Sequence, residues 1–466
     1  MIENHTFAEI EIGDTTHLLR QLQAEDIQLF AAMSGDVNPA HVDPEYANNT
    51  QFHGIIAHGM WGAALISTVL GTEYPGPGTI YLSQSLNFLK PVHIGDTIDI
   101  RLTVSSKDEH KHHVTFECCC TNQAGDAVIT GSALVLAPTE KIRRVRMAPM
   151  QVHLSDKTLQ YRQLLALTQG LPPISVAVVH PCSEEALLGA IQAAQKRLIV
   201  PILVGPETKI RAVAQNAKID LGGYKIVNAP HSHAAAALAV TMAFKGEVQS
   251  LMKGSLHTDE LMAEIFRHTD GLSTDRRASH VFVLDVPSYP KPLLITDAAI
   301  NIEPDIDAKR DIVQNAIDLA HAMGIGMPKV AVLAAVETVN AKMTATLDAA
   351  ALCKMADRGQ ITGGIVDGPL AFDNAISAQA AKDKGIVSPV AGHPDILVAP
   401  NLDAANMLAK QLQYLADAQA AGIVMGLRIP IILTSRADGA LARVASCALA
   451  LLVVHARQAA LSGAAG

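Results

Sequence analysis

The hydrophobic and polar positions near the start of the chain follow the two-residue period of β-strands. Residues 97–106 alternate between apolar and polar side chains, and residues 112–121 repeat the pattern. Such alternation is typical of antiparallel strands that bury one face and expose the other. The inward positions of the second strand include Cys118 and Cys120, so we interpret the run of three cysteines as core packing.

One segment of this region has a helical period instead. It begins at His58, and small residues surround its apolar positions. The positions at helical spacing are Trp61, Ala64, Leu65, Thr68 and Val69. A helix that is apolar around most of its circumference is expected to be buried. A buried helix wrapped by a curved antiparallel sheet is the hotdog fold, so we predict an α+β hotdog domain here.

Beyond about residue 174 the pattern changes to short apolar runs that alternate with helical segments. Ser183 is suited to cap the first of these helices, because Glu184 and Glu185 follow it in the first turn. The apolar runs are residues 174–179, 199–204, 225–227, 281–284, 330–336, 396–398 and 429–433. This alternation predicts βαβ units and a mostly parallel sheet.

The two patterns divide the chain into two domains. Residues 138–150 are basic, lack a pattern and are bounded by prolines. We therefore predict a first domain over residues 1–140, a linker over 141–155 and a second domain over 156–466.

Composition narrows the classes of function. The chain has 466 residues, 49% of them hydrophobic, and a formal net charge of −9. These values favour a globular protein and argue against a nucleic-acid surface as the main function. Only 4% of residues are aromatic, which also disfavours stacking platforms for single strands.

The cysteines and the apolar runs indicate a reduced, soluble setting. Six cysteines without Cys-x-x-Cys spacing are neither a disulfide framework nor a zinc site. The first residues lack a signal peptide, and the apolar run 444–454 is too short to span a bilayer. We therefore expect a cytoplasmic protein without membrane or nucleic-acid partners and without a bound metal.

Polar residues that the scaffold does not need gather at residues 34–44. Asn38 and Pro39 are turn residues, and they would bring Asp36 and His41 together after a helix. A carboxylate and an imidazole on one turn can hold a water between them and accept its proton. A turn-capping aspartate and a structural histidine would explain the same residues.

A second element favours the chemical interpretation. Gly59 opens the predicted buried helix, so its backbone N–H lacks an intrahelical acceptor and lies at the positive end of the helix dipole. Such a group is suited to stabilise an oxyanion on a thioester carbonyl. We assign no chemistry to the neighbouring His58.

Residues 16–137 resemble the MaoC-like (R)-specific enoyl-CoA hydratases, also called hydratase 2. The matching blocks are residues 34–41 (SGDVNPAH), 56–60 (IAHGM) and 81–96 (YLSQSLNFLKPVHIGD). The resemblance implies Asp36 and His41 as the catalytic dyad, the Gly59 amide as oxyanion donor, Ser67 as a supporting residue and Asn38 as a substrate contact. In that family water adds across a trans-2-enoyl-CoA to give the (R)-3-hydroxyacyl-CoA.

In the second domain, polar residues follow the apolar run 429–433. A hydroxyl, a guanidinium and a carboxylate come next, from Ser435, Arg436 and Asp438. In open α/β sheets ligands bind at the carboxyl ends of strands, and arginine binds phosphate with two donors. A capped helix start with a solvated arginine is the alternative. Neither a Gly-x-Gly-x-x-Gly fingerprint after a strand nor a Walker loop is present, which disfavours nucleotide cofactors and ATP.

Residues from about 174 onward resemble the phosphate acetyl/butyryltransferase family. The matching blocks are residues 295–302 (ITDAAINI), 312–316 (IVQNA), 366–374 (VDGPLAFDN), 388–392 (SPVAG) and 433–438 (LTSRAD). The resemblance implies a two-lobed α/β fold of the isocitrate-dehydrogenase-like type and the reaction acyl-CoA + phosphate ⇌ acyl phosphate + CoA. It implies that Ser435 hydrogen-bonds the reacting groups, that Arg436 binds phosphate, and that Arg276, Arg277 and Asn374 contact substrate.

Two positions depart from the pattern of that family. Ala442 stands where the acetyl-specific branch carries a carboxylate proposed as the base for the CoA thiol, and Asp438 is the nearest substitute. Ser273 stands where butyryl-type sequences carry arginine.

Taken together, the two halves resemble bifunctional enoyl-CoA hydratase/phosphate acyltransferase proteins. We expect no cofactor, because coenzyme A thioesters, water and phosphate are the substrates. We also expect a homo-oligomer of at least two chains. Three alternatives remain: a transferase whose hotdog half only binds acyl-CoA, a non-catalytic acyl-CoA-responsive protein, and a decarboxylating dehydrogenase of related fold.

Overall fold

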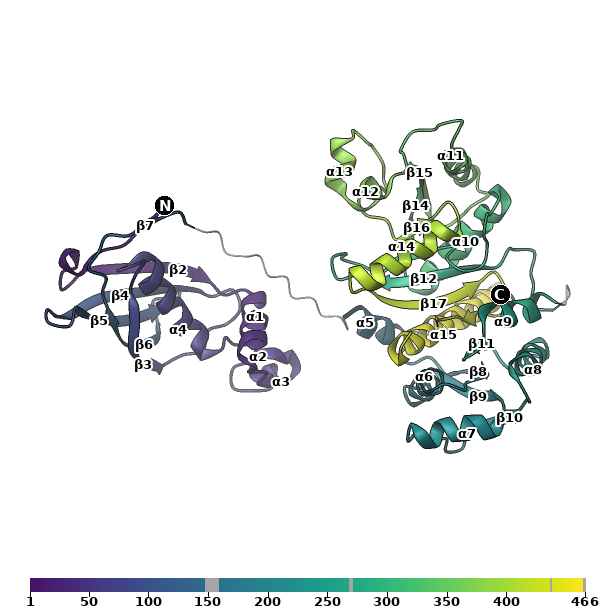
Figure 1. Ribbon diagram of the computed structural model, residues 1–466, viewed down its shortest axis with the longest axis horizontal. Helices are drawn as coiled ribbons and strands as arrows, with labels where there is room; N and C mark the ends of the chain where they lie inside the picture. The colour runs from purple at the N-terminus through teal and green to yellow at the C-terminus, as the bar shows by residue number, and fades with distance from the viewer. Residues whose placement is uncertain (147–158, 268–270, 436–437, 464–466) are drawn as a thin grey trace. The chain divides into compact units, whose positions relative to one another are not determined.

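The computed structural model describes residues 1–146, 159–267, 271–435 and 438–463. The chain divides into two compact units, Met1–Leu154 and Ser155–Gly466 (Figure 1). Most of the predicted linker lies outside the described residues. Its first part packs on the first unit instead, where β7 (Arg143–Arg144) pairs with β1 (Ile2–Glu3) and Lys141 forms ion pairs with Glu3 and Glu9.

The first unit contains a five-stranded sheet in the order β2-β4-β5-β6-β3, with antiparallel neighbours throughout. The strands are β2 (Thr15–Gln21), β3 (Ile80–Phe88), β4 (Thr97–Asp108), β5 (His113–Thr121) and β6 (Ala127–Leu136). The two alternating segments form β4 and β5 as predicted, and their inward residues, Cys118 and Cys120 among them, are fully buried. The alternation therefore identified the core face correctly.

The apolar helix packs on this sheet as α4 (Gly59–Thr68), which a π-helical turn, Val69–Glu73, continues. Its buried face is formed by Trp61, Gly62, Ala63, Ile66, Val69 and Leu70. The predicted burial is confirmed for one face of the helix only, because Ala64, Ser67 and Thr68 are exposed. The sheet covers only one side of α4, and small residues tolerate either environment.

Three short helices connect β2 to α4 and carry the polar residues singled out above. They are α1 (Ala24–Ser34), α2 (Pro39–Val42) and α3 (Pro44–Asn48). A 3₁₀ turn, Phe7–Glu9, precedes them and contributes the buried Phe7 to the core of this unit.

The second unit contains an eleven-stranded sheet in the order β10-β9-β8-β11-β18-β17-β12-β13-β16-β14-β15. Pairing is parallel except where β17 and β12 join the two halves of the sheet, at the pairs β18–β17, β17–β12 and β12–β13. The strands are β8 (Ile174–Val179), β9 (Ile199–Gly205), β10 (Lys225–Asn228), β11 (Ser250–Lys253), β12 (Ser279–Asp285), β13 (Leu293–Thr296), β14 (Lys329–Leu333), β15 (Ile365–Leu370), β16 (Ile396–Val398), β17 (Gln419–Met425) and β18 (Ile431–Ile432).

Helices cover both faces of this sheet (Figure 1). On β8, Val176 and Val178 pack in a cluster with α6 and α15, whereas Ala177 and Val179 pack with α8 and α9. A strand buried on both faces has a continuous apolar sequence. The helices are α5 (Leu159–Leu167), α6 (Glu184–Gln195), α7 (Glu207–Asn216), α8 (Ser232–Phe244), α9 (Thr258–Phe266), α10 (Ile306–Ala322), α11 (Thr344–Asp357), α12 (Phe372–Ile376), α13 (Ala378–Asp383), α14 (Leu402–Leu415) and α15 (Ala440–Gly463).

The last helix, α15, is the one helix in the described ranges that is long and apolar enough to cross a membrane, with a mean hydropathy of 1.6. In this structure 56% of that apolar stretch is buried inside the unit. Its residues Val444, Cys447 and Leu451 belong to the main hydrophobic core. The core helix of a globular unit passes the same test of length and composition.

Candidate active sites

The turn after α1 brings Asp36 and His41 together. Gly35 ends α1 in the left-handed conformation, with φ of 77°, which favours glycine. Asn38 then caps α2 by accepting from the N–H of Ala40 at 3.1 Å, and Asp36 accepts from the N–H of Asn38 at 3.2 Å. Asn38 is therefore a capping residue here, and its substrate contact stays a prediction.

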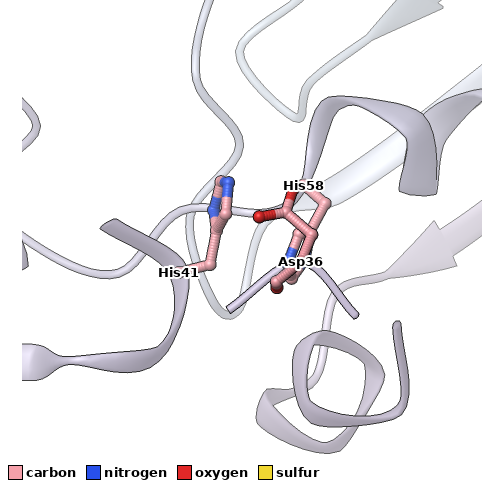
Figure 2. Close-up of side chains that lie close together, drawn as sticks. All are labelled: Asp36, His41 and His58. Atoms are coloured by element: carbon pink, nitrogen blue, oxygen red, sulfur yellow. Dashed lines mark hydrogen bonds between the residues drawn. The ribbon is translucent and has the colours of Figure 1, made fainter. Parts of the chain in front are cut away.

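The hydrogen bonds of His41 define which nitrogen is available for chemistry. Its Nδ1 lies 2.9 Å from the carbonyl oxygen of Ile56. A carbonyl oxygen only accepts, so the neutral ring carries its proton on Nδ1 and leaves Nε2 as an acceptor. In Figure 2 the Asp36 carboxylate points toward this ring.

His58, to which the sequence analysis gave no chemistry, contacts both members of the dyad. Its Nε2 donates to the backbone carbonyl of Asp36 at 2.9 Å, and its ring contacts that of His41 with centroids 4.0 Å apart and planes tilted by 34°. The side chain is only 2% exposed, and its Nδ1 has no hydrogen-bond partner among the described residues. A buried histidine directly before the oxyanion glycine was the available sequence signal.

The spacing of these three side chains leaves room between them. Asp36, His41 and His58 each offer one polar atom, and these atoms lie within 4.8 Å of one another. Three polar atoms this close together can hold one water molecule by hydrogen bonds.

Gly59 is the first residue of α4, as predicted, with His58 at the N-cap. A Cβ at Gly59 would lie 3.1 Å from the ring of Phe88, so a side chain there would crowd the approach to the amide. A cavity of about 330 Å³ opens beside it, lined by His41, Phe52, Trp61 and Ile129 among others. The amide, the histidine and a largely apolar pocket thus adjoin one another.

Ser67, the supporting residue of the prediction, lies two turns further along α4. Its side chain is exposed, and among the described residues that line the cavity Ser67 is absent. The structure of one chain therefore separates Ser67 from the dyad.

In the second unit, Ser435 follows β18 at the carboxyl edge of the parallel strands. Asp438, the candidate base, accepts at Oδ2 from the backbone N–H of Ser435 at 2.7 Å. Asp438 therefore stabilises the turn that carries Ser435. The predicted phosphate ligand Arg436 lies outside the described residues.

The neighbouring strands β8 and β11 end beside β18 in the sheet order. His180 follows β8 and Ser255 follows β11, and the Ser255 hydroxyl donates to the carbonyl of His180 at 2.9 Å. The N–H of Cys182 donates to the same hydroxyl at 3.1 Å. Polar groups from three adjacent strands thus form one edge of the sheet, the usual place for a ligand in α/β proteins.

A buried arginine that the sequence analysis missed lies behind this edge. Arg443 of α15 is 1% exposed and donates to the Thr434 hydroxyl at 2.9 Å and to the Ser435 carbonyl at 3.1 Å. Burial lowers the pKa of its guanidinium, while the negative charges of Asp438 and Glu185 oppose that shift. A lone charged residue within an apolar helical run was the sequence signal for it.

His280 holds the same strand end from the other side. Its Nε2 lies 3.2 Å from the carbonyl oxygen of Leu433, and the backbone N–H of His280 donates to Asp297 Oδ1 at 3.1 Å. Burial lowers the pKa of this imidazole, which favours the neutral ring. Asp297 also accepts from the N–H groups of Ala299, Ile300 and Asn301, so the 295–302 block forms a buried polar turn.

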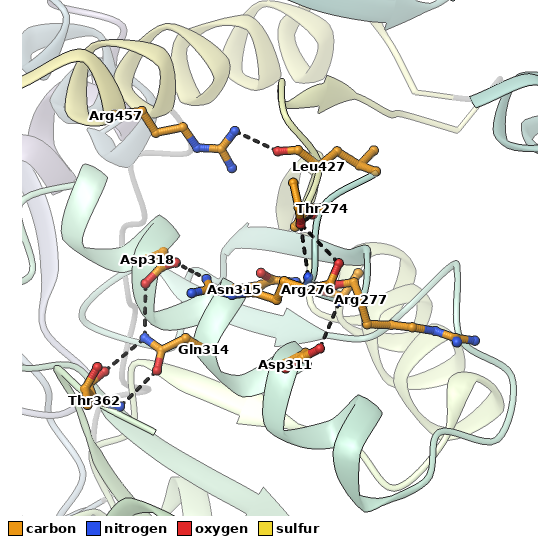
Figure 3. Close-up of polar contacts among 12 residues, drawn as sticks. Thr274, Arg276, Arg277, Asp311, Gln314, Asn315, Asp318, Thr362, Leu427 and Arg457 are labelled. Carbon is orange, nitrogen blue, oxygen red and sulfur yellow. Dashed lines mark hydrogen bonds and ion pairs between the residues drawn. The ribbon is translucent and has the colours of Figure 1, made fainter. Parts of the chain in front are cut away.

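Arg276 and Arg277 line a different cavity, of about 590 Å³, with Ser273 on its wall. Arg276 forms an ion pair with Asp318. The Nε of Arg277 donates to Asn301 at 2.8 Å, and the backbone N–H of Arg277 donates to Asp311 at 2.9 Å (Figure 3). Ser435 and Asp438 do not belong to the described lining of this cavity. Both arginines already have acidic or amide partners within the chain.

The remaining positions singled out by the sequence lie elsewhere in the second unit. Asn374 is fully buried at α12 and donates to Glu337 at 3.4 Å. Ala442 is in the first turn of α15, directly before Arg443. The described contacts join Ser435 to Asp438 but do not join either to Asn374.

Family comparisons agree with this division of the chain. Residues 230–451 match the family described as phosphate acetyl/butaryl transferase, and residues 9–121 match the MaoC like domain. A curated phosphate acetyltransferase from Rhizobium meliloti is 60% identical over 301 residues, which cover 65% of this chain and 95% of that protein. A phosphate butyryltransferase from Clostridium beijerinckii is 40% identical over 293 residues, 63% of this chain and 97% of that protein.

A solved structure also matches the second unit. The branched-chain phosphotransacylase from Enterococcus faecalis V583 is 30% identical, covers 60% of this chain and 99% of its own, and gives a TM-score of 0.53. The likeness extends over nearly the whole of each of these relatives.

Proposed function

We propose that the two units of this chain catalyse two separate reactions of acyl-CoA thioesters. The chain belongs to the phosphate acetyl/butyryl transferase family, and a MaoC-like domain precedes the transferase unit in the sequence. The second unit transfers an acyl group between coenzyme A and phosphate. The first unit hydrates a trans-2-enoyl-CoA to the (R)-3-hydroxyacyl-CoA.

In the transferase reaction a phosphate oxygen attacks the thioester carbonyl, the C–S bond breaks, and the CoA sulfur leaves and is protonated. Ser435, at the edge formed by β8, β11 and β18, is in the region where such a ligand would bind. Arg436 would hold the phosphate through its planar fork. Acetyl-CoA is the first substrate to test, since the relative with 60% identity is a phosphate acetyltransferase.

In the hydratase reaction Asp36 accepts a proton from a water, and the water oxygen bonds to C3 of the enoyl group. The electrons move toward the thioester oxygen, where the Gly59 N–H stabilises the charge. C2 then takes the proton that Asp36 accepted, which completes the addition of one water and restores the carboxylate. His41 orients the water through Nε2, because its Nδ1 is committed to Ile56.

The observation that carries this proposal is that His41, His58 and Gly59 line one largely apolar cavity, with Asp36 offering an oxygen within 4.8 Å of both histidines. A module that only bound acyl-CoA would need the cavity but would not need a carboxylate and an imidazole around space for a water. The bifunctional assignment therefore accounts for more of the residues than binding alone.

The experiment is to incubate the full chain with crotonyl-CoA and, separately, with acetyl-CoA or butyryl-CoA plus phosphate. Chiral analysis of the first product and mass analysis of the second identify the reactions. We expect (R)-3-hydroxybutyryl-CoA and an acyl phosphate. Acyl transfer without hydration would favour the alternative in which the hotdog unit only binds acyl-CoA.

We further propose that the second unit has the two-lobed arrangement of isocitrate-dehydrogenase-like proteins and that neither reaction uses a cofactor. The protein works in the cytoplasm and assembles from at least two chains. Sedimentation of a single-chain species at micromolar concentration would contradict the last point.

A further inference from the structure

The turn that carries Ser435 is held from inside the unit by the side chain of Arg443. One guanidinium nitrogen donates to the Thr434 hydroxyl at 2.9 Å and, at 3.4 Å, to the carbonyl of Lys253 at the end of β11. The other terminal nitrogen donates to the Ser435 carbonyl at 3.1 Å. One side chain therefore links the ends of β11 and β18.

The surrounding core is shaped to admit this arginine. A Cβ at Gly189 of α6 would lie 2.7 Å from both Cβ and Cδ of Arg443, so only glycine leaves room for the arginine side chain. The absence of a side chain at Gly189 lets α6 and α15 pack closely around Arg443. The arginine is thus built into the interface between these helices.

Burial makes the charge of Arg443 effective at the edge of the sheet. The guanidinium is nearly inaccessible to water, so its field is screened less than that of a surface arginine. The nearby carboxylates of Asp438 and Glu185 stabilise the charged form of the guanidinium. A buried positive charge behind Ser435 favours an anion on the open side.

We propose that Arg443 is a positioning residue of the acyl-transfer site, which fixes the Ser435 turn through its fork and attracts phosphate through its charge. This inference rests on the proposed transferase function. The two roles are separable. Lysine keeps the positive charge but lacks the planar guanidinium that donates hydrogen bonds to Thr434 and Ser435 at the same time.

The test measures kcat and the KM for phosphate in acyl-phosphate formation from acetyl-CoA, for Arg443→Met and Arg443→Lys. Loss of a buried charged hydrogen bond should lower kcat about tenfold or more in both variants. The KM for phosphate should rise in Arg443→Met and return toward the wild-type value in Arg443→Lys. A purely structural role would not produce this split between the two parameters.

Arg457 provides a matched control on the same helix. Unlike Arg443 it is only partly buried, and it donates to the backbone carbonyls of Leu427 at 2.9 Å (Figure 3) and Arg428 at 3.1 Å. Within the described ranges no hydrogen bond joins it to Thr434 or Ser435. Arg457→Met should leave both parameters within about twofold of wild type, as for a residue away from the reacting groups. An equal loss in Arg457→Met would overturn the proposal.

A milder variant decides the question if Arg443→Met fails to fold. Thr434→Val preserves shape and removes one acceptor of Arg443, and it should lower kcat several-fold while thermal unfolding stays near wild type. Unchanged kcat and KM in folded Arg443→Lys and Thr434→Val would contradict the proposal. Absence of acyl-phosphate formation in the wild-type chain would instead refute the transferase function itself.

Discussion

The Nε2–H of His58 donates to the backbone carbonyl of Asp36 at 2.9 Å, while the His58 ring contacts the His41 ring at a tilt of 34°. One buried side chain therefore fixes the backbone of the proposed base and the ring of its partner. The contact also joins the turn before α2 to the N-cap of α4, so it sets Asp36 relative to the Gly59 amide. The geometry of the hydratase site depends on three segments that meet at this histidine.

We predict that His58→Phe retains the ring contact and lowers the kcat of hydration. The Asp36 carbonyl loses its donor, and the loss of one buried hydrogen bond corresponds to a decrease of about tenfold in kcat. Steady-state hydration of crotonyl-CoA measures the effect. His110→Phe, in the exposed turn between β4 and β5, is the control, and equal activities of the two variants would remove His58 from the account.

Asp36→Asn should reduce hydration by at least about a hundredfold, because the amide cannot accept the proton. His41→Ala should cause a comparable loss. The double variant should be scarcely worse than either single one, since both residues serve one water. Additive losses would indicate that Asp36 and His41 act in separate steps.

The strands that bury one face completely were predicted best from the sequence. Strands β4 and β5 bury one face completely, so their alternation predicted them well. In the second unit β11, β13, β15 and β17 were missed, because β15 and β17 contain glycine and the other two span four residues each. Periodicity is weak in such segments.

The contacts that build the sites could not be predicted from local pattern. Asp36 and His58 are 22 residues apart, and Lys253 and Arg443 are 190 apart. The motifs identified Asp36, His41 and Ser435, but only the packing of distant segments revealed that His58 and Arg443 hold them. Likewise, the ion pair of Arg276 with Asp318 joins residues 42 apart.

Arg436 gives a prediction that rests on the sequence alone. Arg436→Lys should weaken acyl transfer measurably, because a single ammonium cannot reproduce a bidentate phosphate contact. Arg436→Ala should nearly abolish it. The KM for phosphate is the quantity to follow, and an unchanged KM in Arg436→Ala would show that phosphate binds elsewhere.

Buried thiols should resist alkylation. Burial raises the pKa of Cys118, Cys120 and Cys447 to about 12 in each case, and the thiolate is the reactive form. We expect iodoacetamide to leave these three unmodified in the folded protein between about pH 7 and about pH 8.5, where an ordinary thiol begins to ionise. The partly buried Cys119, Cys182 and Cys353 should react before these three.

The unfolded chain is the control for that experiment. In denaturant all six cysteines should react, at a rate that rises about tenfold per pH unit below the thiol pKa. Mass analysis of peptides identifies each site. Rapid labelling of Cys118 or Cys120 in the native protein would contradict their burial in the sheet.

The central claim is that the two units are separate catalysts on one chain, and a two-by-two assay tests it most directly. Asp36→Asn and Ser435→Ala are each assayed for hydration of crotonyl-CoA and for acyl-phosphate formation, after folding and oligomeric state are matched to wild type. The account predicts that Asp36→Asn loses only hydration and Ser435→Ala loses only acyl transfer. Loss of both activities in either folded variant would contradict it.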